Sequence, residues 1–516
     1  MTSKINNIVI LGGGTAGWLS ACILAKKMNC LNSSELNISV VESPDIPTIG
    51  VGEGTVPTMR QTLKLIGVSE TDFIRECGVT FKQSIKFVNW LDVPNSNIPH
   101  SYHHFFNFPK NPGFDLTPYW LLGDKEHSYA DYVSFQSGAC NHNLAPKKIT
   151  HKEFDGALEY AYHLDAAKFS TFLAKHGTAN LGIKHIIATV KDVCLTDNGD
   201  IKSLITNENN EIDGDFFVDC SGFSSRLLAQ ELQVGFIDKG HQLLVNRAVA
   251  MQVPYADPEQ EILPYTTATA QDAGWIWDIG LTHRRGVGYV YSSEHITDEE
   301  AESKLRQYVG NGSDELNVRI IPMKVGYRDK IWHKNCVAMG LAAGFVEPLE
   351  ATALLLVEAS AKLLADKIPC FKNEMNYAQK SFNQISQYGW DRVIDFIKLH
   401  YLLSNRTDTK FWRDNQDPKT VPESLSDKLN HWKNNLPTTS DFFSQYEVFR
   451  LENYQYVLYG MEFNTDINSV EQRYTEKKAA INVVKNIQDQ IKIVPQHLDS
   501  HRTLIDKIKE FGLNKI

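Results

Sequence analysis

The sequence of 516 residues lacks the features that mark several protein classes. No apolar run reaches the roughly 18 residues that a membrane-spanning helix needs, so we expect no membrane partner. Acidic residues outnumber basic ones, which gives a net charge of -10 and a pI near 6.0. A chain of this charge is not attracted to nucleic-acid phosphates or to anionic lipid, and we expect no nucleic-acid partner. Internal repeats are also absent.

The eight cysteines are widely scattered along the chain. No two of them lie within the spacing of about two to four residues that is typical of a zinc site or a redox pair, so the sequence predicts no metal centre. The chain runs from Met1 into an apolar segment without a charged leader, which predicts no secretion signal. We therefore expect a cytoplasmic protein with reduced thiols.

Residues 8–42 contain the pattern of a dinucleotide-binding unit: a strand, a glycine-rich turn, a helix and a second strand. The glycines at 12, 14 and 17 match G-x-G-x-x-G, which lets a pyrophosphate approach the positive end of the helix. Glu42 ends the second strand, where an acid binds ribose hydroxyls. The alternative is a plain structural turn. The residues expected at the cofactor here are Gly12, Gly14, Thr15, Ala16, Gly17 and Glu42.

Two later segments indicate that the dinucleotide is FAD. Residues 213–222 and 335–344 each read as a buried strand that ends in glycine, and the second leads to a helix that starts near Leu349. Gly340 and Leu349 are the residues expected at the cofactor here. This arrangement is similar to flavoprotein monooxygenases of the hydroxylase type, in which three such approaches surround an extended FAD. The alternative is two ordinary strand-to-helix turns.

The chain shows no second G-x-G-x-x-G between a strand and a helix. The pair Gly286 and Gly288 leads into strand-like residues and lacks the helix that holds a pyrophosphate. We therefore expect reduced flavin to come from a separate NAD(P)H-dependent flavin reductase.

The domain organisation follows from a change in composition and periodicity near residue 372. Residues 1–372 are predicted to form an α/β FAD-binding module with a Rossmann-like, doubly wound fold. A mixed, substrate-facing sheet is interleaved at about 90–150 and 235–325. Residues 373–516 show helical periods and are predicted to cover the substrate, and their final basic stretch is predicted to be a solvated helix.

From Ile8 to at least Trp412 the chain resembles the flavin-dependent tryptophan halogenases. The matching segments are residues 12–18 (GGGTAGW), 52–55 (GEGT), 80–82 (TFK), 102–103 (YH), 161–165 (AYHLD), 274–277 (GWIW), 340–345 (GLAAGF), 347–350 (EPLE) and 400–401 (HY). The resemblance implies an enzyme that uses FADH2, dioxygen and chloride or bromide to halogenate tryptophan, indole or a related aromatic. A homodimer is also compatible with the resemblance.

Within this resemblance, Lys82 is the implied halogen donor, either as a haloamine or as an ammonium that polarises hypohalous acid. A lysine suits both roles because its amine becomes nucleophilic when desolvated and its ammonium is a movable hydrogen-bond donor. Lys82 falls between the apolar Phe81 and Ile85. The alternative is a solvent-exposed lysine with no role in the chemistry.

Glu350 is the implied base, because electrophilic attack leaves a cationic ring that a carboxylate stabilises and deprotonates. The alternative is a first-turn carboxylate that stabilises the helix dipole. Backbone N–H groups of Thr352 and Ala353 are the implied halide ligands. Here the chain departs from the family, which has Ser-Thr-Gly or Ser-Thr-Ser where this sequence has Ala351-Thr352-Ala353. An altered halide preference is one consequence we expect.

Trp275 and Trp277 correspond to the family's Trp-x-Trp pair, although its Ile-Pro ending is Ile279-Gly280 here. Two indoles form a rigid wall that would separate the substrate from the flavin; the alternative is strand core. His103 and Tyr454 are weaker candidates for substrate contact, since histidines and aromatics at such positions are commonly packed in the core. An aromatic hydroxylase and a non-catalytic flavin-binding protein remain alternatives for the whole chain.

Overall fold

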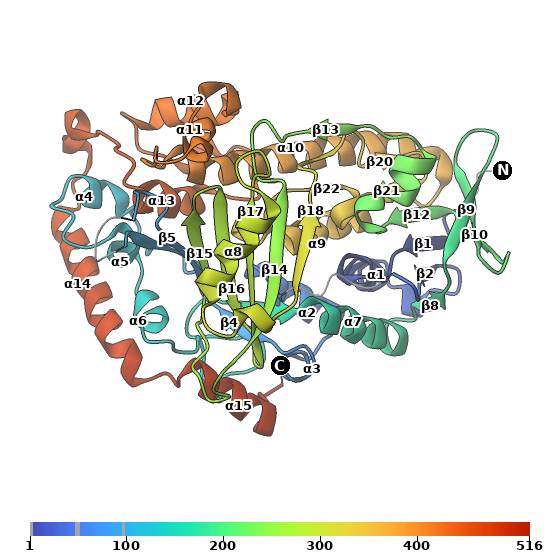
Figure 1. The fold of residues 1–516 in the computed structure, drawn as a ribbon, viewed down its shortest axis with the longest axis horizontal. Coiled ribbons are helices and arrows are strands. Elements are labelled where there is room, and N and C mark those ends of the chain that lie inside the picture. The colour runs from blue at the N-terminus through green and yellow to red at the C-terminus, as the bar shows by residue number, and fades with distance from the viewer. Residues whose placement is uncertain (1–3, 47–51, 95–98, 516) are drawn as a thin grey trace. The chain divides into compact units, whose positions relative to one another are not determined.

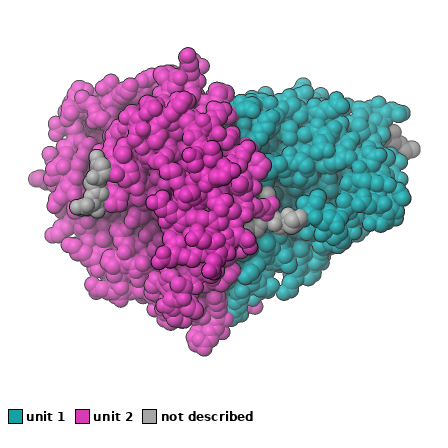
Figure 2. All heavy atoms as spheres, in the orientation of Figure 1, with its two compact units in different colours: residues 1–78, 164–239, 324–390 teal, residues 79–163, 240–323, 391–516 magenta. Residues whose placement is uncertain are grey.

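The computed structural model describes residues 4–46, 52–94 and 99–515; Met1 and Ile516, named above, lie outside them. The chain divides into two compact units, which Figure 2 colours separately. Unit 1 comprises Met1–Gly78, Leu164–Lys239 and Lys324–Trp390, and unit 2 comprises Val79–His163, Gly240–Met323 and Asp391–Ile516. Each unit is therefore assembled from three separate stretches of sequence.

Unit 1 is built on a six-stranded sheet with β1 near its middle. In spatial order its strands are β20 (Trp332–His333), β21 (Cys336–Ala338), β12 (Phe216–Asp219), β1 (Asn7–Leu11), β2 (Asn37–Glu42) and β8 (Lys184–Ile187). All neighbours are parallel except β20 and β21. The central strands are almost wholly apolar because a parallel sheet is buried on both faces.

Helices and two small sheets complete unit 1. The helices are α1 (Thr15–Lys27), α2 (Thr58–Ile66), α3 (Glu70–Glu76), α7 (Ala166–Asn180), α9 (Thr352–Lys367) and a π-helix at Arg226–Glu231. The small sheets contain β9 (Val190–Leu195), β10 (Ile201–Thr206) and β11 (Glu211–Asp213), and β13 (Phe236–Asp238), β19 (Gly326–Arg328) and β22 (Gly344–Phe345). A short strand, β3, covers Gly52–Gly54. Helix α1 packs against α7 and α9, so the glycine turn is anchored from several directions.

Unit 2 contains a seven-stranded sheet that is mostly antiparallel. Its spatial order is β18 (Val318–Pro322), β14 (Arg247–Pro254), β17 (Arg284–Tyr291), β16 (Gly274–Gly280), β15 (Thr266–Gln271), β5 (Ser84–Val88) and β6 (Ser101–Phe105). Only β15 and β5 run parallel. The short strand β4 (Thr80–Lys82) lies outside this sheet and pairs antiparallel with β7 (Ala161–Asp165).

The helices of unit 2 come mainly from the C-terminal third of the chain. They are α4 (Thr117–Leu121), α5 (Tyr129–Val133), α6 (Ser137–Cys140), α8 (Asp298–Val309), α11 (Lys410–Asn415), α12 (Glu423–Trp432), α13 (Leu451–Gly460), α14 (Lys477–Ile493) and α15 (His501–Phe511). The long α10 (Met375–Leu402) begins in unit 1 and ends in unit 2. Figure 1 shows α8 against strands β14 and β17.

The prediction of an α/β fold with a helical C-terminal region is confirmed. The prediction of a solvated terminal helix is wrong for α15, which has one buried face made of His501, Arg502, Leu504, Ile505 and Ile508. Its apolar residues recur at helical spacing, and burial of that stripe outweighs the basic composition of the segment. In the described part of the chain, no helix is long and apolar enough to cross a membrane.

Candidate functional site

The glycine turn of unit 1 is shaped by close backbone contacts. Gly12 has φ of +117°, and a Cβ placed there would lie 2.3 Å from the carbonyl oxygen of Cys220. A Cβ on Gly17 would lie 1.9 Å from the carbonyl oxygen of Gly12. Both positions therefore require glycine, the first for its dihedral angle and both for space.

Gly14 differs from these two glycines, because a Cβ placed there would have no heavy atom within 4 Å. Gly14 is the N-cap of α1, and no side chain caps that end of the helix. The first-turn N–H groups have no partner within a helix, and they lie beside this open space. The residues present thus fit the pyrophosphate of FAD. Thr15 donates its hydroxyl to the Ala166 carbonyl at 3.2 Å, and Ala16 packs against Gly340, whose added Cβ would lie 2.7 Å from that of Ala16.

The Glu42 carboxylate lies directly beside the turn. A Cβ on Gly13 would be 2.1 Å from its carboxyl carbon. Its Oε2 accepts a hydrogen bond from His185 Nε2 at 2.7 Å and a longer one from Trp18 Nε1 at 3.4 Å. Glu42 is thus fixed beside the glycine turn, and His185 is a partner that sequence reasoning missed.

The chain reverses sharply where the halide ligands are predicted. A 3-10 turn at Pro348–Glu350 is followed by Ala351, whose φ of 56° and ψ of 39° are left-handed, and α9 begins at Thr352. A left-handed alanine costs about 1 kcal/mol. A right-handed residue followed by a left-handed one aims successive N–H groups into one concavity, which binds anions. Glu350 is buried, with 2% of its surface exposed.

The Thr352 side chain gives independent support for an anion at this turn. Thr352 is wholly buried, and its hydroxyl oxygen makes no hydrogen bond to the described protein. A buried hydroxyl without a partner costs free energy, so it points to a ligand that it can contact. The first-turn N–H groups of α9 have no partner within the helix, and together with this hydroxyl they fit a halide.

Lys82 lies on β4 in unit 2 and is wholly buried. Its Nζ lies 5.2 Å from the centre of the Phe106 ring. Lysines are almost never fully buried unless they are paired. By contrast Lys86, on β5, is only partly buried, and its Nζ lies 5.8 Å from the centre of the Tyr265 ring.

His163 is a titratable residue on β7, the strand that pairs with β4. It is paired with Thr80 in register, is wholly buried, and contacts the Thr266 hydroxyl through Nε2 at 2.8 Å. Burial first, and then the neighbouring Lys82 and His501, hold the pKa of His163 well below its usual value. His163 is therefore neutral at physiological pH and adds no second charge beside Lys82.

Trp275 and Trp277 lie on β16, and their ring centres are 6.4 Å apart. Trp275 also lies 6.5 Å from the ring of Trp90. Trp277 is opposite Gly288 on β17, where an added Cβ would lie 2.2 Å from the indole. Gly288 thus serves to admit the Trp277 ring, which accounts for a glycine that the nucleotide motif does not use.

His103 and Tyr454 lie in packed surroundings. His103, on β6, contacts the Ser84 hydroxyl through Nδ1 at 2.9 Å and stacks on Phe105. Burial, with a smaller contribution from Lys86, lowers the pKa of His103 to about 3. Tyr454, on α13, is 1% exposed, and its ring contacts those of Phe396, Trp432 and Phe442.

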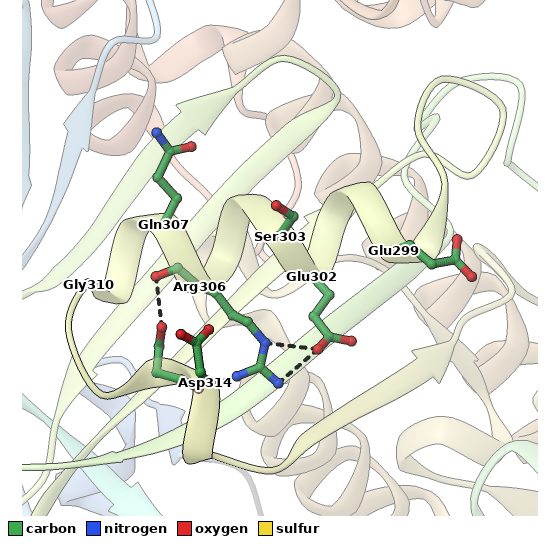
Figure 3. Close-up of a pocket in the computed structure, with 8 residues that line it drawn as sticks. Glu299, Glu302, Ser303, Arg306, Gln307, Gly310 and Asp314 are labelled. Carbon is green, nitrogen blue, oxygen red and sulfur yellow. Dashed lines mark hydrogen bonds and ion pairs between the residues drawn. The ribbon is translucent and has the colours of Figure 1, made fainter.

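A surface depression of about 610 Å³ lies along α8 (Figure 3). Glu302, Arg306 and Asp314 are among its lining residues, and Arg306 is held by Glu302 at 2.8 Å. None of the predicted site residues lines it. Within residues 4–46, 52–94 and 99–515, no group of three or more His, Cys, Asp or Glu side chains is arranged to hold a metal ion.

Sequence reasoning missed His163, His185 and His501, which contact predicted site residues or their strand. His163 lies within one of the family-like segments, but nothing in its spacing links it to Lys82. His501 reaches the Phe81 backbone across 420 positions. No local sequence pattern predicts a contact between residues so far apart. The helical spacing of the apolar residues in 501–508 indicates only that His501 lies on the buried face of its helix.

Comparisons with known proteins identify the family of the chain. The family model for tryptophan halogenase matches residues 7–475. The crystal structure of a tryptophan halogenase from Shewanella frigidimarina superposes with a TM-score of 0.95 at 41% identity, covering 100% of this chain and 99% of that one. Tar14, a tryptophan C-6 flavin-dependent halogenase from taromycin biosynthesis, gives 0.89 at 31% identity, covering 98% and 100%. Tryptophan 7-halogenase RebH from Lentzea aerocolonigenes is 32% identical, over 91% of this chain and 92% of the relative.

Proposed function

Because the chain belongs to the tryptophan halogenase family and is a flavin-dependent halogenase by type, we propose that it halogenates an electron-rich aromatic ring. FAD enters as FADH2 and, with dioxygen and a halide, supplies hypohalous acid when bound. The overall change replaces one ring hydrogen by halogen and releases water. Tryptophan, indole and related rings are the proposed substrates, since the relatives act on tryptophan at different ring positions.

Lys82 is the proposed halogen donor. In the haloamine form, the Lys82 amine displaces hydroxide from hypohalous acid, forms an N–halogen bond and loses one proton, with water as the leaving product. The ring then takes the halogen and the amine recovers a proton. In the alternative form, the ammonium donates a hydrogen bond to hypohalous acid and polarises it. The complete burial of Lys82 is the observation that carries the proposal, because a desolvated amine is a better nucleophile.

Glu350 is the proposed base. Addition of the halogen leaves a positive charge on the ring, which the carboxylate stabilises before it takes the ring proton. Glu350 is buried at a turn whose neighbouring N–H groups we propose as the halide site, through Thr352 and Ala353. The Trp275 and Trp277 pair is proposed to separate substrate from flavin.

A separate NAD(P)H-dependent flavin reductase is the proposed source of FADH2. The support is that Gly286 and Gly288, the other candidate glycines, lie within strand β17, and Gly288 accommodates Trp277. Gly288 is therefore explained without a nicotinamide cofactor.

Product analysis tests the proposal. The full chain would be supplied with a flavin reductase, FAD, NADH, dioxygen, and bromide or chloride, together with a panel of indoles that includes tryptophan. Mass spectrometry should detect halogenated product that requires halide. A hydroxylated product formed without halide would instead identify a hydroxylase, and flavin binding without any product would identify a non-catalytic protein.

A further inference from the structure

The strand that carries Lys82 is fixed along both edges. On one edge β4 pairs with β7, with Lys82 opposite Ala161. On the other edge the two neighbours of Lys82 donate their backbone N–H groups to different acceptors. Gln83 donates to the carbonyl oxygen of Pro264 at 2.7 Å, and Phe81 donates to Nε2 of His501 at 2.8 Å. Buried N–H groups need such partners, and here they fix the backbone on both sides of the lysine.

His501 fills a gap in this second edge. Its Nδ1 lies 3.0 Å from the carbonyl oxygen of Ile262, two residues before Pro264. Pro264 therefore reaches the strand directly, whereas Ile262 reaches it only through the imidazole. A backbone N–H can only donate and a carbonyl can only accept, so His501 carries its proton on Nδ1 and accepts at Nε2.

This bridge needs a neutral imidazole, and the surroundings favour one. His501 is wholly buried, and burial lowers its pKa to about 4. The charged or titratable groups near it are Arg502 on its own helix, His163 on β7, and Lys82, which follows Phe81 on β4. The positive charge of Arg502 also lowers the pKa of His501.

Helix α15 holds the imidazole in place. Its N-terminus is capped by the Ser500 side chain, which accepts from Thr503 N–H, and the His501 N–H donates to the Asn143 carbonyl at 2.9 Å. Arg502 donates its Nε to the carbonyl of Gln260. The same helix thus contacts the 260–262 segment twice, once through Arg502 and once through His501.

We propose that His501 is a positioning residue for halogen transfer, holding β4 so that Lys82 presents its amine at one fixed place. The inference rests on the proposed role of Lys82. His501 itself touches no reacting atom. Its importance follows from geometry, since a displacement of about 1 Å at a reacting group can cost about 100-fold in rate.

The test compares three substitutions at His501 in the full-length holoenzyme. His501→Gln keeps one acceptor and one donor, His501→Asn is too short to make both bonds, and His501→Leu makes neither. His497→Leu, at an exposed histidine just before α15, is the matched control. For each variant one would measure halogenated indole, reduced flavin consumed, and hypohalous acid released to an added scavenger.

We expect His501→Leu to lower halogenated product per reduced flavin at least about tenfold, with hypohalous acid release maintained. The loss should fall on kcat more than on KM for indole. His501→Gln should recover most of the product, His501→Asn less, and His497→Leu should match the wild type. If His501→Leu fails to fold, the order of Gln above Asn decides the question.

Equal product per flavin in all three His501 variants would overturn the inference, as would a loss in His501→Leu that matches a loss of flavin binding. Lys82→Ala separates these results from failure of the proposed function. If that variant still gives wild-type halogenated product, the donor role fails. If it loses product while the His501 variants do not, only the positioning role of His501 fails.

Discussion

The glycine turn of unit 1 and strand β4 of unit 2 are built in different ways. The turn depends on backbone groups within one βαβ unit and on the nearby Cys220 segment, where added Cβ atoms would lie as close as 1.9 Å to the backbone. Strand β4 depends on single side-chain contacts from distant segments, of which the bond from Phe81 to His501 spans 420 positions. The glycines that shape the turn are therefore visible in a short stretch of sequence. The side-chain contacts that hold β4 come from distant residues, and no short stretch of sequence reveals them.

The largest expected effect comes from Gly17→Ala in the glycine turn. The new Cβ would lie 1.9 Å from the Gly12 carbonyl oxygen, and neither helix nor strand can move aside cheaply. We expect a loss of about 3 kcal/mol in the free energy of unfolding, measured by urea denaturation. A loss below about 0.5 kcal/mol would show that the backbone of the turn can move to accept a side chain at position 17. The turn would then not depend on close backbone contacts.

The pH dependence of stability tests the side-chain bridge of β4. His501 has a pKa of about 4 in the folded chain and about 6.5 when unfolded, so only the unfolded chain takes up this proton between those values. Stability therefore falls as pH drops from about 6.5 to about 4, by about 3 kcal/mol from this group, and no further below.

His501→Gln removes this titration but leaves His103 and His163 in place. The unfolding free energy of the variant should fall less steeply than that of the wild type over the same pH range. Parallel profiles for the two proteins would mean that His501 is not held neutral in the fold.

Glu350→Gln tests the carboxylate that we propose as base. We expect kcat for halogenation to fall about 100-fold, because general-base catalysis contributes about that much or more. Flavin affinity should not change, and a ring-deuterated substrate should react more slowly than its hydrogen form in the variant. A wild-type rate would assign Glu350 to helix stabilisation instead.

Gly14→Ala separates cofactor binding from folding within unit 1. The added Cβ meets no protein atom, so the urea midpoint should match the wild type. The methyl group would nevertheless occupy the space that we assign to pyrophosphate, and FAD should bind at least about tenfold more weakly, or about 1.4 kcal/mol. Unchanged affinity, measured by flavin fluorescence titration, would place the pyrophosphate elsewhere.

The smallest effects are expected at Ala351. Ala351→Gly removes the strain of a left-handed alanine but increases the conformational entropy of the unfolded chain. Because the two effects oppose each other, the free energy of unfolding should change by less than about 1 kcal/mol. Ala351→Ser restores the hydroxyl that the family usually carries beside the halide turn. Steady-state rates with bromide and chloride should shift in ratio for the serine variant, and an identical ratio would exclude a role for that hydroxyl.

The sequence predicted the α/β class and the strand–turn–helix–strand unit, because hydrophobic runs and glycine spacing are local signals. Strand β1 and helix α1 lie where the pattern placed them, and the segment at 335–344 contains strand β21, which ends at Ala338, shortly before Gly340. The sharp turn at Ala351 could not be predicted, because an alanine does not indicate a left-handed conformation.

The surroundings of Lys82 were predictable only in part. Its apolar neighbours signalled burial, and family-like segments marked the strand. The bridge through His501 depends on tertiary packing of a terminal helix whose basic composition indicated solvent. A single histidine in such a helix carries no signal of its partner, and only coordinates reveal the contact.

The most direct test of the central claim compares Lys82→Ala with Lys86→Ala, a partly buried lysine four positions away, on β5. Both variants would receive FADH2, dioxygen, bromide and indole, and mass spectrometry would measure bromoindole alongside scavenged hypobromous acid. We predict that Lys82→Ala releases hypobromous acid but makes no enzyme-dependent bromoindole, whereas Lys86→Ala resembles the wild type. Bromoindole at the wild-type level from Lys82→Ala would rule out Lys82 as the halogen donor.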